Sequence, residues 1–136
     1  MRVYLDTGAL IALLAANDRH HRAAASYFRA SLKKGVRFLL GRPVLVEYLD
    51  GVAKRVDKAT AIEELRRIES SSVLLVEPAV EEDWERARDL FLRYDGQAID
   101  LTDSLSFAMM ERLHLAEVFT FDPDFAVHGF SPVPRS

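Results

Sequence analysis

Acidic side chains stand at four places in this 136-residue sequence where a carboxylate could take part in chemistry. Two aspartates each come directly after a short apolar run, Asp6 after residues 3–5 and Asp122 after residues 118–121. Glu47 is the only charged residue within the apolar stretch 44–49, and Asp103 falls in the first turn of an expected helix. Each acid also has a structural explanation: the aspartates suit turns and helix starts, and Glu47 suits the exposed edge of its helix.

The elements that would position these acids follow from the apolar pattern. Short runs rich in β-branched and aromatic residues predict strands buried on both faces. These runs cover residues 3–5, 36–40, 73–76 and 118–121. Residues 130–133 predict a short edge strand, because Pro132 cannot donate a hydrogen bond to a central ladder.

Longer amphipathic segments separate the strands. Helices are expected at about residues 9–16, 20–34 and 43–55, then after Asp57 and after Thr102, both of which suit an N-cap. Another helix is expected to bury one stripe of side chains, formed by Val80, Trp84, Ala87, Phe91 and Tyr94. This alternation predicts an α/β fold with a mainly parallel sheet that helices cover on both sides.

The bulk composition limits the class of protein. With 49% hydrophobic residues and a length of 136, the chain is expected to form a single domain over residues 1–136. We expect a cytoplasmic protein, because no apolar run is long enough for a membrane span or a signal peptide and there is no cysteine. The net charge of −3 means that nucleic acid could bind only at a local basic patch or through bound cations.

A bound metal would let the acids occupy one site. Two carboxylates about 5 Å apart repel by roughly 3 kcal/mol at an effective dielectric constant near 20. No basic residue is adjacent in sequence to any of the four acids, which leaves a hard divalent cation, Mg²⁺ or Mn²⁺, as the simplest compensation. Zinc fits less well, because paired ligand spacing is missing among the histidines, which are His20, His21, His114 and His128.

Four segments of the chain together resemble the PIN-domain nucleases, and within them the VapC-type toxins of type II toxin-antitoxin systems. The resemblance covers nearly the whole chain. It rests on residues 3–9 (VYLDTGA), 44–47 (VLVE), 101–107 (LTDSLSF) and 119–125 (FTFDPDF), with Gly129 and Phe130 near the end. It implies a three-layer sandwich with a five-stranded, mainly parallel sheet, one or two Mg²⁺ or Mn²⁺ ions, and cleavage of RNA.

The resemblance also assigns individual roles. Its catalytic and metal-binding acids correspond to Asp6, Glu47, Asp103 and Asp122, and Thr7 to a hydroxyl that supports the site. At Asp100 such toxins often carry serine, so this acid is either an additional group near the metal or, as we favour, a helix cap. Asp124, two residues beyond Asp122, is expected to face solvent.

The function implied is that of a metal-dependent endoribonuclease, inhibited by a small antitoxin protein and commonly assembled as a homodimer. The alternatives are a non-catalytic PIN-fold interaction module and a housekeeping PIN nuclease. A haloacid-dehalogenase-type phosphohydrolase is disfavoured, because Gly8 stands where that family needs a second aspartate. Candidate contacts to the RNA backbone are Lys33, Lys34, Arg37, Arg42, Lys54, Arg55 and Lys58.

Overall fold

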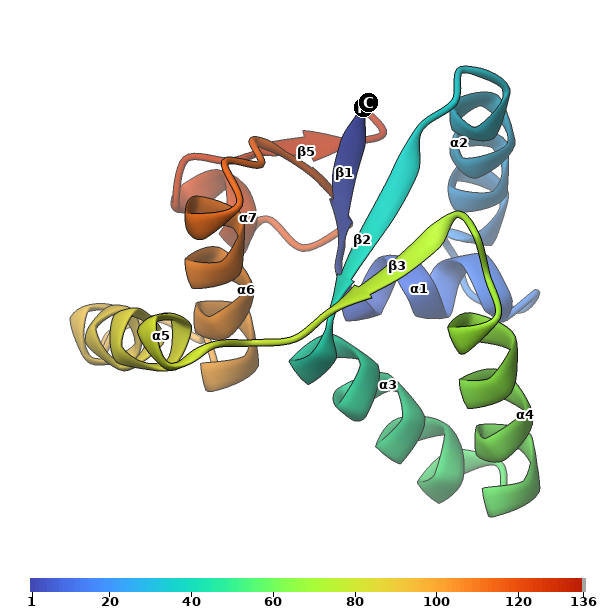
Figure 1. The fold of residues 1–136 in the computed structure, drawn as a ribbon, viewed down its shortest axis with the longest axis horizontal. Coiled ribbons are helices and arrows are strands. Elements are labelled where there is room, and N and C mark those ends of the chain that lie inside the picture. Colours follow the sequence, from blue (N-terminus) through green and yellow to red (C-terminus); the bar gives the residue numbers. More distant parts are fainter. Residues whose placement is uncertain (136) are drawn as a thin grey trace.

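The computed structural model describes residues 1–135 and contains a five-stranded sheet in which every pairing is parallel (Figure 1). The strands are β1 (Arg2–Leu5), β2 (Arg37–Gly41), β3 (Leu74–Glu77), β4 (Glu117–Phe119) and β5 (Ser131–Val133). Their order across the sheet is β3-β2-β1-β4-β5. The expected fold class is therefore confirmed, including the proline-containing strand at one edge.

Helices flank this sheet on two sides, with α1 and α2 on one side and α5, α6 and α7 on the other (Figure 1). The helices are α1 (Thr7–Leu14), α2 (His21–Lys33), α3 (Arg42–Arg55), α4 (Lys58–Glu69), α5 (Glu81–Arg93), α6 (Leu101–Arg112) and α7 (Asp124–Val127). The antiparallel pair α3 and α4 extends away from the sheet (Figure 1). Within the described part of the chain, no helix is both long and apolar enough to cross a lipid bilayer.

The strand order places a topological switch point between β1 and β4. From β1 the chain proceeds outward through β2 to β3, and it later returns to the other side of β1 to add β4 and β5. Leu5 is paired with Phe119, so these two strands end side by side. Ligands of open parallel sheets bind beyond the carboxyl ends of strands at such a point.

Large apolar side chains from both sides of the sheet form the core next to the switch point. Tyr4, Phe38, Phe107, Phe119 and Phe125 are all fully buried. The Tyr4 hydroxyl donates a hydrogen bond to Ser106 Oγ at 2.8 Å, which ties β1 to α6. Tyr4 therefore satisfies its polar atom inside the core, as a buried tyrosine must.

Several sequence-based expectations about the elements were wrong in detail. The strand at residues 73–76 is half-buried rather than buried on both faces, because β3 lies at the sheet edge. Strand β4 ends at Phe119, so Asp122 lies beyond the strand and does not directly close it. Helix α6 begins one residue after Asp100, which is its N-cap in place of Thr102.

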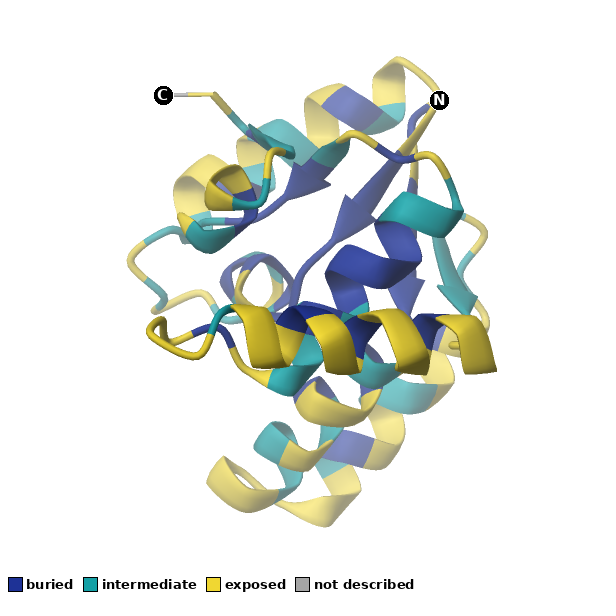
Figure 2. Ribbon diagram, turned by 90° about the vertical axis from the view of Figure 1, so that its left-hand side faces the viewer, coloured by how far each residue is buried: buried dark blue, intermediate teal, exposed yellow. Residues whose placement is uncertain are grey.

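Helix α5 buries a different face from the one expected. Trp84 and Phe91 are 44% and 43% exposed, whereas Asp83, Ala87 and Leu90 face inward. Figure 2 shows α5 across the front of the molecule, with exposed residues along most of its outer surface. The reason is electrostatic, because Asp83 is paired with Arg112 on α6 and this contact sets the rotation of α5.

Candidate active site

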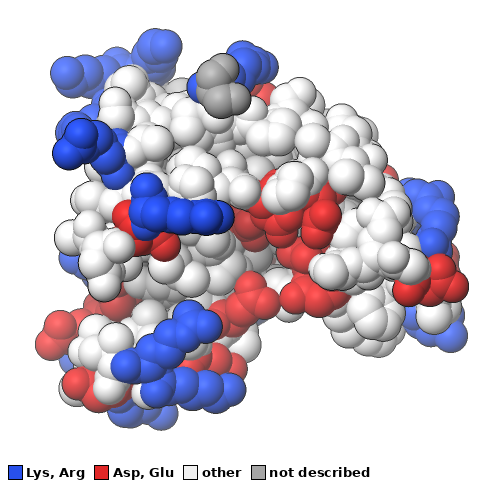
Figure 3. Space-filling view, turned by 180° about the vertical axis from the view of Figure 1, so that it is seen from behind, with Lys and Arg blue, Asp and Glu red and all other residues white. Residues whose placement is uncertain are grey.

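An open groove at the switch point brings together all the residues expected at the site. It is lined by Asp6, Thr7, Glu47, Asp100, Asp103 and Asp122, together with side chains of α1, α3 and the loop before α2. On the face shown in Figure 3, acidic side chains gather in a central hollow, while lysines and arginines lie mostly toward the periphery. Residues from four distant parts of the chain therefore meet in one acidic groove.

Thr120 connects the two aspartates of the switch point. Its hydroxyl donates to Asp6 Oδ2 at 2.9 Å and accepts from the backbone N–H of Asp122 at 3.0 Å. Asp6 occupies the N-cap position of α1, but its side chain makes no capping hydrogen bond, so capping does not explain this buried carboxylate. Sequence reasoning missed Thr120, whose only local signal is a hydroxyl within the apolar run 118–121.

Asp103 is positioned by a reciprocal capping arrangement at the start of α6. The Asp103 N–H donates to Asp100 Oδ1 at 2.8 Å, and the Asp100 N–H donates to Asp103 Oδ2 at 3.3 Å. Such a capping box satisfies backbone groups that the first helical turn leaves unpaired. Asp100 is therefore the helix cap, as favoured from the sequence, and it still lies at the groove.

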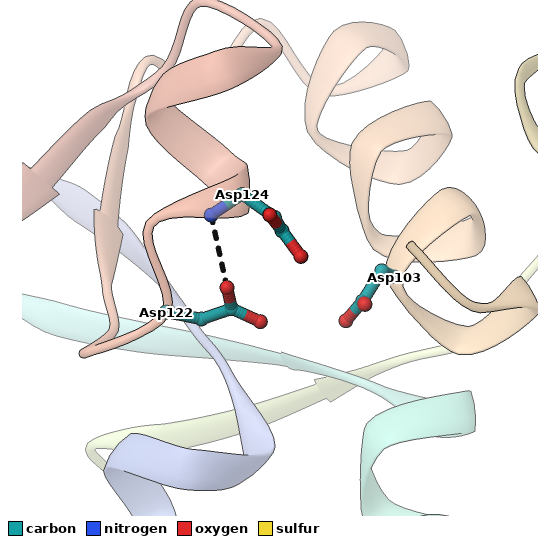
Figure 4. Close-up of side chains that lie close together, drawn as sticks. All are labelled: Asp103, Asp122 and Asp124. Atoms are coloured by element: carbon teal, nitrogen blue, oxygen red, sulfur yellow. Dashed lines mark hydrogen bonds between the residues drawn. The ribbon is translucent and has the colours of Figure 1, made fainter. Parts of the chain in front are cut away.

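Asp124 does not simply face solvent as expected. It is half-buried, and its backbone N–H donates to Asp122 Oδ1 at 2.9 Å. Carboxylate oxygens of Asp103, Asp122 and Asp124 lie within 4.8 Å of one another. Figure 4 shows Asp122 and Asp124, from the segment after β4, facing Asp103 across a gap. The unexpected feature is the turn at Pro123, which brings Asp124 back toward the groove.

Glu47 approaches the groove from α3 and is exposed. Helix α3 is buried on one face only, since Val44 and Tyr48 are buried, whereas Val46 beside Glu47 is 52% exposed. Of the two alternatives left open by the sequence, the exposed edge of the helix is therefore the correct one for Glu47, because only the opposite face of α3 packs against the rest of the protein. The Glu47 carboxylate therefore lies exposed to solvent at the rim of the groove.

The proximity of these acids changes their ionisation. Burial raises the pKa of Asp6 to about 6, partly offset by the Thr120 hydrogen bond and reinforced by the charges of Asp122 and Glu47. Burial and the charges of Asp100, Asp6 and Asp122 raise the pKa of Asp103 to about 8. Without a cation, the groove therefore favours partial protonation near neutral pH.

These shifts predict that the metal-free protein loses stability as pH rises. An aspartate with a pKa near 3.8 in the unfolded chain binds its proton more tightly when folded, so the penalty develops between about pH 4 and pH 8. Asp103→Asn is expected to reduce this loss by on the order of 1 kcal/mol at pH 8, since Asp103 is only half-buried.

Urea unfolding in a chelator at pH 5 and pH 8 measures this effect. Asp95→Asn, an exposed substitution away from the groove, is the matched control and should leave the pH dependence unchanged. Equal pH dependence in the wild type and in Asp103→Asn would contradict the prediction.

The donor set fits a hard divalent cation. All the candidate ligands are oxygen atoms, which Mg²⁺ and Mn²⁺ prefer. Thr7 lines the groove, and its buried Oγ1 has no hydrogen-bond partner within residues 1–135, which an ordered ligand or water would satisfy. None of the histidines belongs to a metal-binding cluster in the described chain.

Only part of the expected basic surface lies near the groove. Arg55 lines it, and Lys54 lines an adjoining pocket beside Glu47. Arg37 begins β2, so with Lys33 and Lys34 it lies at the amino ends of the strands, whereas the acids lie beyond the carboxyl ends. Arg19, which was not considered from the sequence, also lines the groove.

The chain belongs to the PIN domain family, whose model matches residues 3–130. It is 28% identical over 131 residues to the 23S rRNA-specific endonuclease VapC20 of Mycobacterium tuberculosis (strain H37Rv), an alignment covering 96% of this chain and 97% of the relative. The crystal structure of M. tuberculosis VapC20, a sarcin-ricin loop cleaving toxin, matches with a TM-score of 0.83 and 25% identity, covering 94% of this chain and 95% of that one.

More distant structures share the fold. VapBC2 from Rickettsia felis, bound to a DNA fragment from its promoter, gives a TM-score of 0.70 at 18% identity, with 97% of each chain covered. VapBC-1 from nontypeable Haemophilus influenzae gives 0.69 at 15% identity, covering 97% of this chain and 96% of that one. The family expected from the sequence is therefore confirmed.

Proposed function

We propose that this protein is a metal-dependent endoribonuclease and the toxin of a VapBC-type toxin-antitoxin pair, with residues 1–136 forming one nuclease domain. The observation that carries the proposal is the acidic groove at the β1/β4 switch point, which contains Asp6, Glu47, Asp103 and Asp122 together. Its PIN-domain membership and its similarity to an rRNA endonuclease over almost its full length support the reaction class.

In this proposal Asp6, Asp103 and Asp122 bind Mg²⁺ or Mn²⁺, and Asp124 adds a carboxylate on the same side as Asp122. When bound, such a cation acts as a Lewis acid on the phosphodiester and lowers the pKa of water. Thr120 holds the Asp6 carboxylate and the Asp122 backbone in fixed relative positions. Asp100 orients Asp103 through the capping box.

Glu47 has a different proposed role because it is exposed at the rim and lies on another helix. We assign Glu47 to orient the attacking water or to accept its proton, because its carboxylate lies at the rim of the same groove. Thr7, with its unpaired Oγ1, is assigned to hold ordered water or substrate beside Asp6.

The proposed partners follow from the same similarity. A small antitoxin protein would cover the groove, and two copies of the chain would form a homodimer in the cytoplasm. Several solved structures of the same fold are toxin-antitoxin complexes, including one from Klebsiella pneumoniae with a TM-score of 0.66 at 18% identity.

Cleavage of RNA by the purified protein tests the proposal. We expect cleavage of 23S rRNA, or of a hairpin with the sarcin-ricin loop sequence, in Mg²⁺ or Mn²⁺, and loss of cleavage in excess chelator. Recovery on adding metal back separates metal removal from denaturation. Cleavage that persists in chelator would overturn the metal requirement.

Expression in a bacterial host distinguishes a toxin from the alternatives. Growth arrest relieved by the product of a small neighbouring gene supports the toxin, and cleavage without growth arrest supports a housekeeping nuclease. Absence of both cleavage and divalent-metal binding would favour a non-catalytic interaction module.

A further inference from the structure

The acidic groove carries a cationic side chain that has no role in the proposed metal site. Arg19 is exposed, lies in the loop between α1 and α2, and lines the groove together with the acids. Arg19 and Arg55 are the cations among the groove-lining residues, and neither forms an ion pair with a carboxylate within residues 1–135. Salt bridges to the acids of the groove therefore do not account for these two arginines.

The guanidinium of Arg19 is held by a hydrogen bond rather than left free in solvent. Arg19 Nε donates to His20 Nε2 at 3.1 Å. The backbone N–H of His20 donates to Asp18 Oδ1 at 2.8 Å, which fixes the loop at this point. Because Nε is used internally, the two terminal amino groups of Arg19 remain available as a donor pair.

The imidazole that holds Arg19 is itself anchored to the catalytic edge of the sheet. The His20 ring stacks on the Phe121 ring with a centroid separation of 4.2 Å and an interplanar angle of 3°. Phe121 in turn contacts the fully buried Phe119 edge-on at 6.2 Å. Phe121 directly precedes Asp122, so a continuous series of rings connects the core, the metal-site loop and Arg19.

This arrangement matches the chemistry of phosphate recognition. A guanidinium with both terminal amino groups free binds a phosphate through two parallel hydrogen bonds, and prior ordering reduces the entropy lost on binding. The groove is strongly acidic, so an RNA chain needs cations on either side of the reacting phosphate. Arg19 provides such a charge, and its loop is connected to the segment of Asp122 through the His20–Phe121 stack.

We propose that Arg19 is a positioning residue that binds an RNA phosphate flanking the one that is cleaved, with the His20–Phe121 stack as its support. This inference rests on the proposed ribonuclease function. It predicts that Arg19 contributes mainly to RNA binding and to its salt dependence, and little to the chemical step, because its contact is with a phosphate that does not react.

Arg19→Gln tests the proposal, with Arg22→Gln as the matched control. Arg22 is exposed, lies three residues further on in α2 and does not line the groove. For Arg19→Gln we expect KM to rise about tenfold with kcat within about threefold of the wild type. Arg19→Lys should keep the charge and recover part of the loss, but not all, since lysine cannot present two parallel donors to a phosphate.

Binding measured in the Asp6→Asn background keeps this inference separate from the proposed function. Fluorescence anisotropy with labelled hairpin RNA should show Kd raised about tenfold by Arg19→Gln, and the slope of log K against log salt reduced by about one. Equal Kd and equal slope for Arg19→Gln and Arg22→Gln would overturn the role of Arg19. Absence of metal-dependent cleavage by the wild-type protein would instead overturn the ribonuclease, whatever Arg19 does.

Discussion

Replacing Asp6 with asparagine is expected to lower metal-dependent RNA cleavage about a thousandfold, which corresponds to roughly 4 kcal/mol of lost transition-state stabilisation. Asp6 is 7% exposed and lies at the switch point of the sheet, where the proposed function assigns it as a ligand of the bound cation. Asparagine keeps an oxygen that can accept the Thr120 hydrogen bond, so the loss reports the missing charge rather than a rearranged groove.

The measurement is the initial rate of hairpin RNA cleavage at saturating Mn²⁺, with urea unfolding of the same sample. Asp6→Asn should be at least as stable as the wild type without metal, because a buried charge has been removed. Asp50→Asn, an exposed substitution one turn from Glu47, should retain the wild-type rate. Cleavage by Asp6→Asn within tenfold of the wild type would contradict the assignment of Asp6.

Replacing Arg112 with methionine is expected to destabilise the protein by about 3 kcal/mol. Arg112 Nε donates to both carboxylate oxygens of Asp83, at 2.9 and 3.1 Å, and Asp83 is only 1% exposed. The backbone N–H of Val80 would remain as a donor to Asp83 at 2.9 Å, but the buried charge would have lost its cation. This pair connects α5 to the end of α6, the helix that begins at the groove.

Urea unfolding measures this effect against Arg86→Met as the control. Arg86 also joins α5 to α6, through Glu111, but both partners are more than a third exposed, so its loss should cost less than about 1 kcal/mol. Adding Asp83→Asn to Arg112→Met should restore part of the stability, because no unpaired buried charge then remains. Similar losses for the two arginine variants would show that burial does not distinguish these pairs.

Local signals in the sequence identified most of the secondary structure. The apolar runs predicted all five strands to within two residues, and Asp57 caps α4 by accepting a hydrogen bond from the Thr60 N–H at 2.7 Å. These features depend on residues only a few positions apart, so they can be predicted from the local sequence. The predicted buried face of α5 was wrong, because the rotation of this helix depends on a contact between Asp83 and Arg112, which are separated by 29 residues.

The residues of the candidate site also fall into those that local sequence predicts and those that only the fold brings together. Asp6 and Asp103 could be selected from the sequence, since one follows a strand and the other occupies the first turn of a helix. The bridging role of Thr120 could not, because it requires β1 and β4 to be paired. The approach of Asp124 to Asp103 could not either, because it depends on how the segment after β4 lies against α6. Arg19 was missed for the same reason, since its loop meets Phe121 only in the folded chain.

By itself, the sequence determined the α/β fold class, the PIN family and the acids available for a metal site. Periodicity, helix capping and strand composition act over short distances and are specified residue by residue. Only the tertiary structure decided that these acids share one groove, that Glu47 stands exposed at its rim and that Arg19 lies beside them. Those relations depend on strand order and on helix packing between residues up to 114 positions apart, as for Asp6 and Thr120.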